Sequence, residues 1–226
     1  MILRRRPLLR RILAIGLGVP LAMVLFYRFV PPPITPLMVI RLVQGQGLNK
    51  DWMPLSAISP DLQRAVMAGE DGKFCTHHGF DWSAIDNAMD VYEEGGHVLG
   101  ASTISMQTAK NLFLWPGRDF VRKGVEAVFT VMMEALWPKR RIMEVYLNII
   151  EFGPGVYGAQ AASQRFFHED ASQLTAAQAA HLIAVLPRPL KWSADEPGPY
   201  MNKRSRVIGG RIGTVREDGL AACVAR

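Results

Sequence analysis

Two adjacent carboxylates, Glu70 and Asp71, stand in a short segment that is dense in groups able to move protons or bind cations, residues 68–81. They fall at the predicted C-terminus of a helix, where two negative charges are unfavourable for the helix dipole. Acids placed against a local rule often mark a functional site. A solvated acidic helix end is the equally weighted alternative for this segment alone.

The same segment holds His77, His78 and Asp81, which could be read as metal ligands. Hydrogen bonds that hold a loop in place are the more ordinary role, and we favour it. No Cys/His set in the chain has the spacing of a zinc site. We therefore predict no metal ligands, and leave open a divalent cation such as Mg²⁺ or Mn²⁺.

A second candidate segment runs from Gly100 to Asn111 and is rich in small and hydroxyl-bearing residues. If a helix begins near Ser102 and Thr103, its amides and hydroxyls could hold an anion such as a phosphate. Gln107, Lys110 and Asn111 would extend this polar face by one turn. A capped helix with an exposed polar stripe is the alternative.

The third candidate is Glu126, which precedes the apolar run 127–133. A carboxylate buried there needs a partner. Arg122 lies four residues earlier on the same helical face, with Lys123 beside it. This group is either a surface ion pair or a second active-site carboxylate among cations.

Two carboxylates suit chemistry at the anomeric carbon of a sugar. A hydrolase that expels a neutral alcohol needs an acid, whereas a transferase that expels pyrophosphate needs cations for the developing charge. The cluster of Lys110, Arg122 and Lys123 favours transfer, and an N-terminal apolar segment suggests a lipid-borne donor.

Five motifs in order, within about residues 60–192, resemble the monofunctional peptidoglycan transglycosylases of glycosyltransferase family 51, which are related to the N-terminal domain of class A penicillin-binding proteins. They are E-D-x-x-F-x-x-H-x-G at 70–79, G-x-S-T-I-x-x-Q-x-x-K-N at 100–111, R-K-x-x-E at 122–126, I-x-E-x-Y-L-N at 142–148 and G-x-G-x-x-G at 153–158. The last has no predicted strand before it, so we do not read it as a dinucleotide fingerprint.

The resemblance implies a mainly α, lysozyme-like domain with a large lobe and a small membrane-facing lobe. It implies that the growing glycan on undecaprenyl pyrophosphate is the donor and lipid II the acceptor, joined β-1,4 with inversion. By motif position Glu70 would be the general base, and Glu126 would assist near the pyrophosphate. The substrate-binding residues would be Asp71, Phe74, His77, Ser102, Thr103, Gln107, Lys110, Asn111, Arg122 and Lys123.

Two other functions stay open: a lysozyme-like lytic enzyme that cuts glycan, and an inactive membrane scaffold with the same fold. Contacts with other cell-wall synthesis proteins are also left open. Gln178 and Arg188 depart from the family pattern, which usually has Glu and Asn there, and Cys75 is an unusual residue within the first motif. No S-x-x-K occurs, so we expect no transpeptidase domain and no penicillin binding.

The elements that position these residues are predicted to be helices. Ser59 can cap a helix that starts at Pro60 and runs to Glu70. Further helices are expected over 120–136, 139–150, 159–167, from Thr175 to Leu186, and near 203–215. The loop at 153–155 separates two of them. No alternating strand pattern of useful length is found.

The N-terminus divides into a basic arm (1–11), an apolar run (12–30), and a stalk and linker (31–58), before the catalytic domain (59–226). The apolar run approaches the length of a spanning helix, and the arginines before it should stay cytoplasmic. We expect an uncleaved, single-pass anchor in the bacterial cytoplasmic (inner) membrane with the domain on the periplasmic side. A cleaved signal peptide is less favoured, since no clear cleavage site follows.

The net charge of +6 is concentrated in that arm, where five arginines occur in the first eleven residues. The remainder carries about +1, so the charge does not indicate nucleic-acid binding. Two cysteines, Cys75 and Cys223, are too few for a disulfide framework. One bridge between them is open in an oxidising compartment, but we favour two free thiols.

Overall fold

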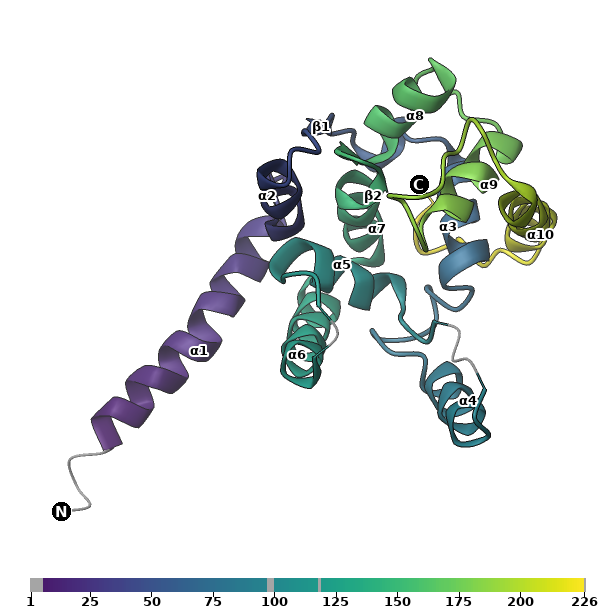
Figure 1. Ribbon diagram of the computed structural model, residues 1–226. Helices are drawn as coiled ribbons and strands as arrows, with labels where there is room; N and C mark the ends of the chain where they lie inside the picture. Colours follow the sequence, from purple (N-terminus) through teal and green to yellow (C-terminus); the bar gives the residue numbers. More distant parts are fainter. Residues whose placement is uncertain (1–5, 97–99, 118, 226) are drawn as a thin grey trace.

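The computed structural model describes residues 6–96, 100–117 and 119–225, with side chains from residue 16 onward. Its chain is mainly helical (Figure 1). The helices are α1 (Arg6–Tyr27), α2 (Pro36–Val43), η1 (Leu55–Ala57, 3-10), α3 (Pro60–Glu70), α4 (Trp82–Glu93), α5 (Ile104–Phe113), α6 (Phe120–Leu136), α7 (Lys139–Ile149), α8 (Ala159–Phe167), α9 (Ala176–Val185) and α10 (Pro199–Glu217). The strands are β1 (Asn49–Lys50), β2 (Glu151–Gly153) and β3 (Val156–Tyr157).

The helix starts follow the capping residues of the sequence. Ser59, Thr103, Asp119 and Thr175 each accept a backbone N–H from the first turn of the helix that follows. Thr175 forms the complete reciprocal capping box with Gln178. The Gln that replaces the family's usual Glu at this position therefore still caps the helix. These predicted helices are therefore confirmed to within a residue or two. The last helix is longer than expected and runs through Gly209 and Gly210.

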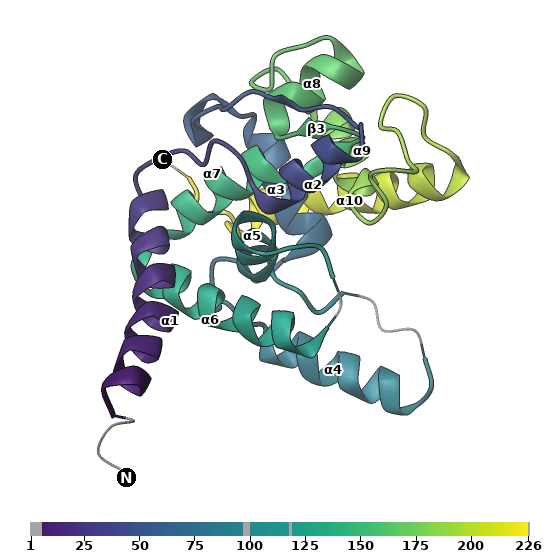
Figure 2. The ribbon, with the colours of Figure 1, turned by 60° about the vertical axis from the view of Figure 1, so that its left-hand side comes forward.

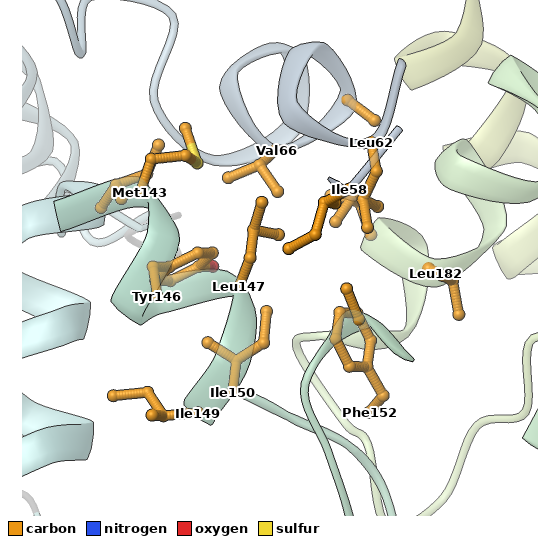
Figure 3. Packing of buried hydrophobic residues seen from close by; sticks show 14 of the residues in the cluster. Ile58, Leu62, Val66, Met143, Tyr146, Leu147, Ile149, Ile150, Phe152 and Leu182 are labelled. Atoms are coloured by element: carbon orange, nitrogen blue, oxygen red, sulfur yellow. The ribbon is translucent and has the colours of Figure 1, made fainter. Parts of the chain in front are cut away.

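Helix α7 lies at the centre of the core, as Figure 3 shows. Met143, Tyr146 and Leu147 are all fully buried on it. They face Val66 of α3, while Phe152 and Leu182 close the other side of the cluster. This packing sets the direction of α3, and with it the place of Glu70 at the end of that helix.

A small three-stranded sheet corrects the expectation that the chain has no strands of note. Its order is β1-β3-β2, with β1 parallel and β2 antiparallel to β3. Strands of two or three residues are too short to show alternation, which is why the sequence pattern missed them. Gly155 turns between β2 and β3 with φ +69°, and a side chain there would meet the backbone oxygens of Gln46 and Gly47. The G-x-G-x-x-G segment thus does begin on a strand, but in an antiparallel hairpin.

Residues 36–58, expected to be part of a stalk and linker, pack into the body. Met38 of α2 and Leu55 of η1 are fully buried in the main core. Asn49 donates from its N–H to the carbonyl of Gly155 across 2.7 Å. The apolar residues of this segment gain more from burial than an extended stalk would allow.

Helix α1 extends away from the body in both views (Figures 1 and 2). Its C-terminal end and the residues just after it are attached to the body: the Trp137 indole donates to the carbonyl of Val24 (2.9 Å), and Arg141 donates to those of Tyr27 and Val30 (2.9 Å each). In the part of the chain that the structure describes, no helix meets the length and apolarity needed to cross a membrane. Arg4 and Arg5 of the basic arm lie outside the described residues.

A disulfide joins Cys75 to Cys223, which corrects the preference for free thiols. The two Cα atoms are 5.4 Å apart although 148 positions separate them in sequence. Cys75 belongs to the segment 68–81 that carries the candidate carboxylates, and Cys223 follows α10. Spacing along the chain cannot reveal such a pair, because only the fold brings the two residues together.

Candidate active site

Glu70 ends helix α3 with its side chain mostly buried, at 15% exposure. One carboxylate oxygen, Oε2, accepts a hydrogen bond from Nε2 of Gln107 (3.0 Å), and Oε1 accepts one from Nη2 of Arg204 (3.0 Å). Burial raises the pKa of Glu70, and these two donors oppose that rise. A carboxylate with a raised pKa and fixed geometry suits proton transfer.

Gln107 is held in the orientation that Glu70 needs. The Tyr146 hydroxyl donates to Oε1 of Gln107 (3.2 Å), which leaves the amide N–H groups toward the carboxylate. Burial raises the pKa of Tyr146 well above its usual value, so the phenol keeps its proton and acts as the donor. The predicted residue Gln107 therefore touches the predicted catalytic residue directly.

Asp71, next in the chain, points elsewhere. Its Oδ2 accepts from the backbone N–H of Ile104 (2.9 Å), and both oxygens contact Nε2 of His77 (2.9 and 3.1 Å). The N–H of Gly79 donates to Nδ1 of His77, so the Nε2 nitrogen carries the proton and donates to Asp71. The carboxylate that was unfavourable at the end of α3 thus lies at the N-terminus of α5, where the helix dipole favours it.

This arrangement changes the expected role of the α5 N-terminus. Thr103 caps it, accepting from Met106 and donating to the carbonyl of Gly79 (2.6 Å), and Asp71 already holds the Ile104 amide. The anion predicted there is therefore the protein's own carboxylate.

Phe74 is fully buried, with the Lys139 ammonium 4.6 Å from its ring centre. The contacts present place Phe74 in the core, and its contact with substrate stays a prediction. Substrate contact by Asp71, His77 and Thr103 stays a prediction, while the contacts present hold the loop 71–81 to α5.

Glu126 is buried in helix α6, at 2% exposure, and is enclosed by cations. Arg122 Nη1 donates to its Oε2 (2.5 Å), and Lys123 Nζ bonds its Oε1. Lys123 also reaches the Ser102 hydroxyl (3.4 Å). Since Arg122 is itself buried, the pair is not the surface ion pair of the alternative reading.

Lys110 lies near both carboxylates. Burial lowers its pKa, the charge of Glu126 opposes this most strongly, and Glu70 also raises it. Both acids therefore lie within electrostatic range of the one ammonium group. The predicted residues Glu70, Gln107, Lys110, Arg122, Lys123 and Glu126 are brought together by the fold.

A pocket of about 280 Å³ opens beside this group. Gln107, Lys110 and Asn111 of α5 line one part of it, and Arg41 and Glu151 line another. The two form an ion pair (3.2 Å) that ties α2 to the hairpin. A larger pocket, about 420 Å³, lies between η1 and residues 221–225 and contains none of the candidate residues.

Among the described residues, no group of three or more His, Cys, Asp or Glu side chains could hold a metal ion. His77 is engaged by Asp71, and Asp81 caps α4 by accepting from Ala84 (3.2 Å). Both oxygens of Glu126 are bound to cationic side chains.

Arg204 bonds Glu70 directly and was not among the predicted site residues. It comes from α10, 134 positions after Glu70, and no quoted motif contains it. Its Nε is buried without a hydrogen-bond partner among the described residues. The only available signal was the basic run 203–206 near the predicted start of the last helix.

A family model described as Transglycosylase matches residues 38–212. Among curated relatives, the biosynthetic peptidoglycan transglycosylase of Caulobacter vibrioides is 55% identical over 220 residues, covering 97% of this chain and 96% of the relative. The proteins of the same name from Rhodospirillum centenum and Bdellovibrio bacteriovorus are 54% and 52% identical over 221 and 198 residues. They cover 96% and 85% of this chain, and 96% and 79% of the respective relatives. With these matches over most of its length, the chain belongs to the transglycosylase family.

Proposed function

We propose that this enzyme polymerises lipid II into β-1,4-linked glycan strands and releases undecaprenyl pyrophosphate. The observation that carries the proposal is that the two carboxylates have different surroundings. Glu70 is a buried acid with a raised pKa, while Glu126 is enclosed by Arg122 and Lys123. The names of the relatives point the same way.

In the proposed step Glu70 takes the proton of the acceptor 4-hydroxyl as that oxygen attacks the anomeric carbon of the donor. The new C–O bond forms as the bond to the pyrophosphate breaks, and the electron pair leaves with the phosphate oxygen. Attack from the opposite face inverts the anomeric carbon. Lys110, Arg122 and Lys123 stabilise the negative charge that develops on the leaving group.

A raised pKa alone would also suit the general acid of a lytic enzyme. The cations decide between the two. A hydrolase that protonates a neutral leaving alcohol gains nothing from three positive groups around its second carboxylate. A transferase that expels pyrophosphate does gain, because the charge on the leaving oxygen grows in the transition state.

We propose further that the enzyme works at the outer face of the cytoplasmic membrane, with α1 in contact with the bilayer. Leu17, Leu21, Leu25 and Phe26 of α1 are exposed apolar side chains. The Cys75–Cys223 disulfide favours an oxidising compartment for the body. Protease added to intact spheroplasts should digest the body, and protection from protease would contradict this placement.

The catalytic proposal is tested by giving purified full-length protein lipid II and, separately, isolated cell-wall sacculi. Long glycan should form with release of undecaprenyl pyrophosphate, and the sacculi should stay intact. Glu70→Gln should lower the rate about 10²- to 10⁴-fold. Degraded sacculi without polymer would indicate a lytic enzyme, and no reaction with either substrate would indicate a scaffold. The same assay with a chelator tests whether a divalent cation takes part.

A further inference from the structure

Another pocket, of about 300 Å³, lies next to the 280 Å³ pocket beside the active site. The 280 Å³ pocket is called the first pocket here, and its neighbour the second pocket. Pro189 lines both pockets. The β2–β3 hairpin also borders both, through Glu151 in the first and Pro154 and Val156 in the second. The two pockets are therefore neighbours along one surface that starts at Gln107, the residue bonded to Glu70.

The second pocket has an aromatic wall. Trp192 lines it, and its ring lies 5.1 Å from that of Tyr200, at the start of α10. Tyr200 is exposed and Trp192 is partly buried. An indole face of this kind packs well against the apolar C–H face of a pyranose ring, because both surfaces are flat and lose water together.

The same pocket is bordered by cations. Arg165 and Lys191 line it, and the Arg188 guanidinium lies 5.7 Å from the Trp192 ring centre. All three are exposed, and none forms an ion pair with any residue that the structure describes. None of the described residues that line the pocket is acidic. The surface is thus suited to a ligand that is a saccharide and carries carboxylates.

We infer that the pocket around Trp192 is a distal subsite for the growing glycan strand, with the Trp192 ring stacking on a sugar and Arg165, Lys191 and Arg188 attracting the carboxylates of its stem peptides. This inference depends on the proposed function and assigns new residues to it. The strand carries pyrophosphate at its reducing end, where Lys110 and Asn111 line the first pocket. Its remaining sugars extend away from that end, through the first pocket into the second.

The test compares two rates on full-length protein with lipid II: formation of the first glycosidic bond, and extension to long strands. Trp192→Ala should leave the first rate within about twofold of the wild type, because the donor in that step is a single lipid II, which carries one disaccharide and no further strand to occupy a distal subsite. It should shorten the mean strand by about two- to tenfold through weaker retention. Trp192→Phe keeps an aromatic face and should restore most of the length.

The cations are tested with the Arg165→Ala/Lys191→Ala double variant. It should shorten strands made from ordinary lipid II and have no effect with an analogue whose stem peptide is replaced by a neutral amide. Arg216→Ala removes an exposed cation at the other end of α10 and is the matched control, expected to leave strand length unchanged.

Wild-type strand length in both the Trp192→Ala variant and the double variant would overturn the inference. A first bond slowed as much as strand extension would also overturn it, since Trp192 would then serve the catalytic core. If Trp192→Ala does not fold, the strand length made by the Arg165→Ala/Lys191→Ala variant decides whether the pocket binds the strand. Failure of the wild type to polymerise lipid II would refute the proposed function instead.

Discussion

Arg204 donates a hydrogen bond from Nη2 to Oε1 of Glu70 across 3.0 Å, joining the start of the last helix to the end of α3. Gln107 holds the other carboxylate oxygen from α5. Three helices that are distant in sequence thus converge on one carboxylate. The bond and the charge of Arg204 both favour the ionised form that a general base requires.

Removal of Arg204 should shift the pH dependence of the reaction. Burial raises the pKa of Glu70 and Arg204 opposes that rise, so Arg204→Gln should raise the pKa further. A base works only when deprotonated, so the acid limb of kcat/KM should move to higher pH and activity should recover in alkaline buffer. The measurement is the polymerisation rate against pH for wild type and variant.

Two companion variants separate this electrostatic effect from a general disturbance of α10. Arg204→Lys keeps the charge and should show a smaller shift. Arg206→Ala removes an exposed neighbour whose one side-chain bond among the described residues is to the carbonyl of Asn202, and its profile should match the wild type. An acid limb in Arg204→Gln that stays in place or moves to lower pH would contradict the role of Arg204.

Truncation of Glu126 should cost both stability and activity. Glu126→Ala leaves the buried Arg122 guanidinium without its carboxylate, which costs about 3–5 kcal/mol of unfolding free energy. Glu126→Gln can still accept a hydrogen bond and should cost less. Urea denaturation measures the difference, and the double variant Glu126→Gln/Arg122→Met should be less destabilised than Glu126→Ala. Wild-type stability in Glu126→Ala would show that the ion pair is not buried in solution.

Loss of Asp71 should lower activity because Asp71 holds the loop 71–81 against α5. Asp71→Ala leaves the buried N–H of Ile104 without its acceptor and releases His77, at a cost of about 1–3 kcal/mol. Asp71→Asn keeps one acceptor and should be milder. Asp86→Ala, which removes an exposed acid from α4, is the control. Thermal unfolding and lipid II turnover should fall together, and a loss of turnover with unchanged stability would instead favour substrate contact.

The disulfide should make stability depend on the redox state. It closes a long loop, with 148 positions between the cysteines, so removing it is expected to cost about 2–5 kcal/mol. Denaturation of the wild type should shift to lower urea when a reductant is added. The Cys75→Ser/Cys223→Ser variant should show the lower midpoint with or without reductant. If the urea midpoint of the fully reduced wild type equals that of the oxidised protein, the disulfide contributes nothing to stability.

The predicted helices were correct where the interactions that start them are local. Ser59 and Thr175 cap backbone groups within three residues, so a short stretch of sequence contains both partners. The strands were missed because their stability comes from pairing across the fold. Asn49 finds its partner in Gly155, more than a hundred residues later.

The sequence by itself determined the family and the helical class, and it predicted the two carboxylates, because these are carried by motifs whose residues are close together in the chain. Only the tertiary structure decided what surrounds Glu70 and where the neighbouring Asp71 turns. It alone paired Cys75 with Cys223 and placed the pocket at Trp192 next to the pocket beside the candidate site, with Pro189 lining both. The physical reason is common to all four: each contact exists only once packing of the apolar core has brought distant helices together, and residue spacing carries no record of that packing.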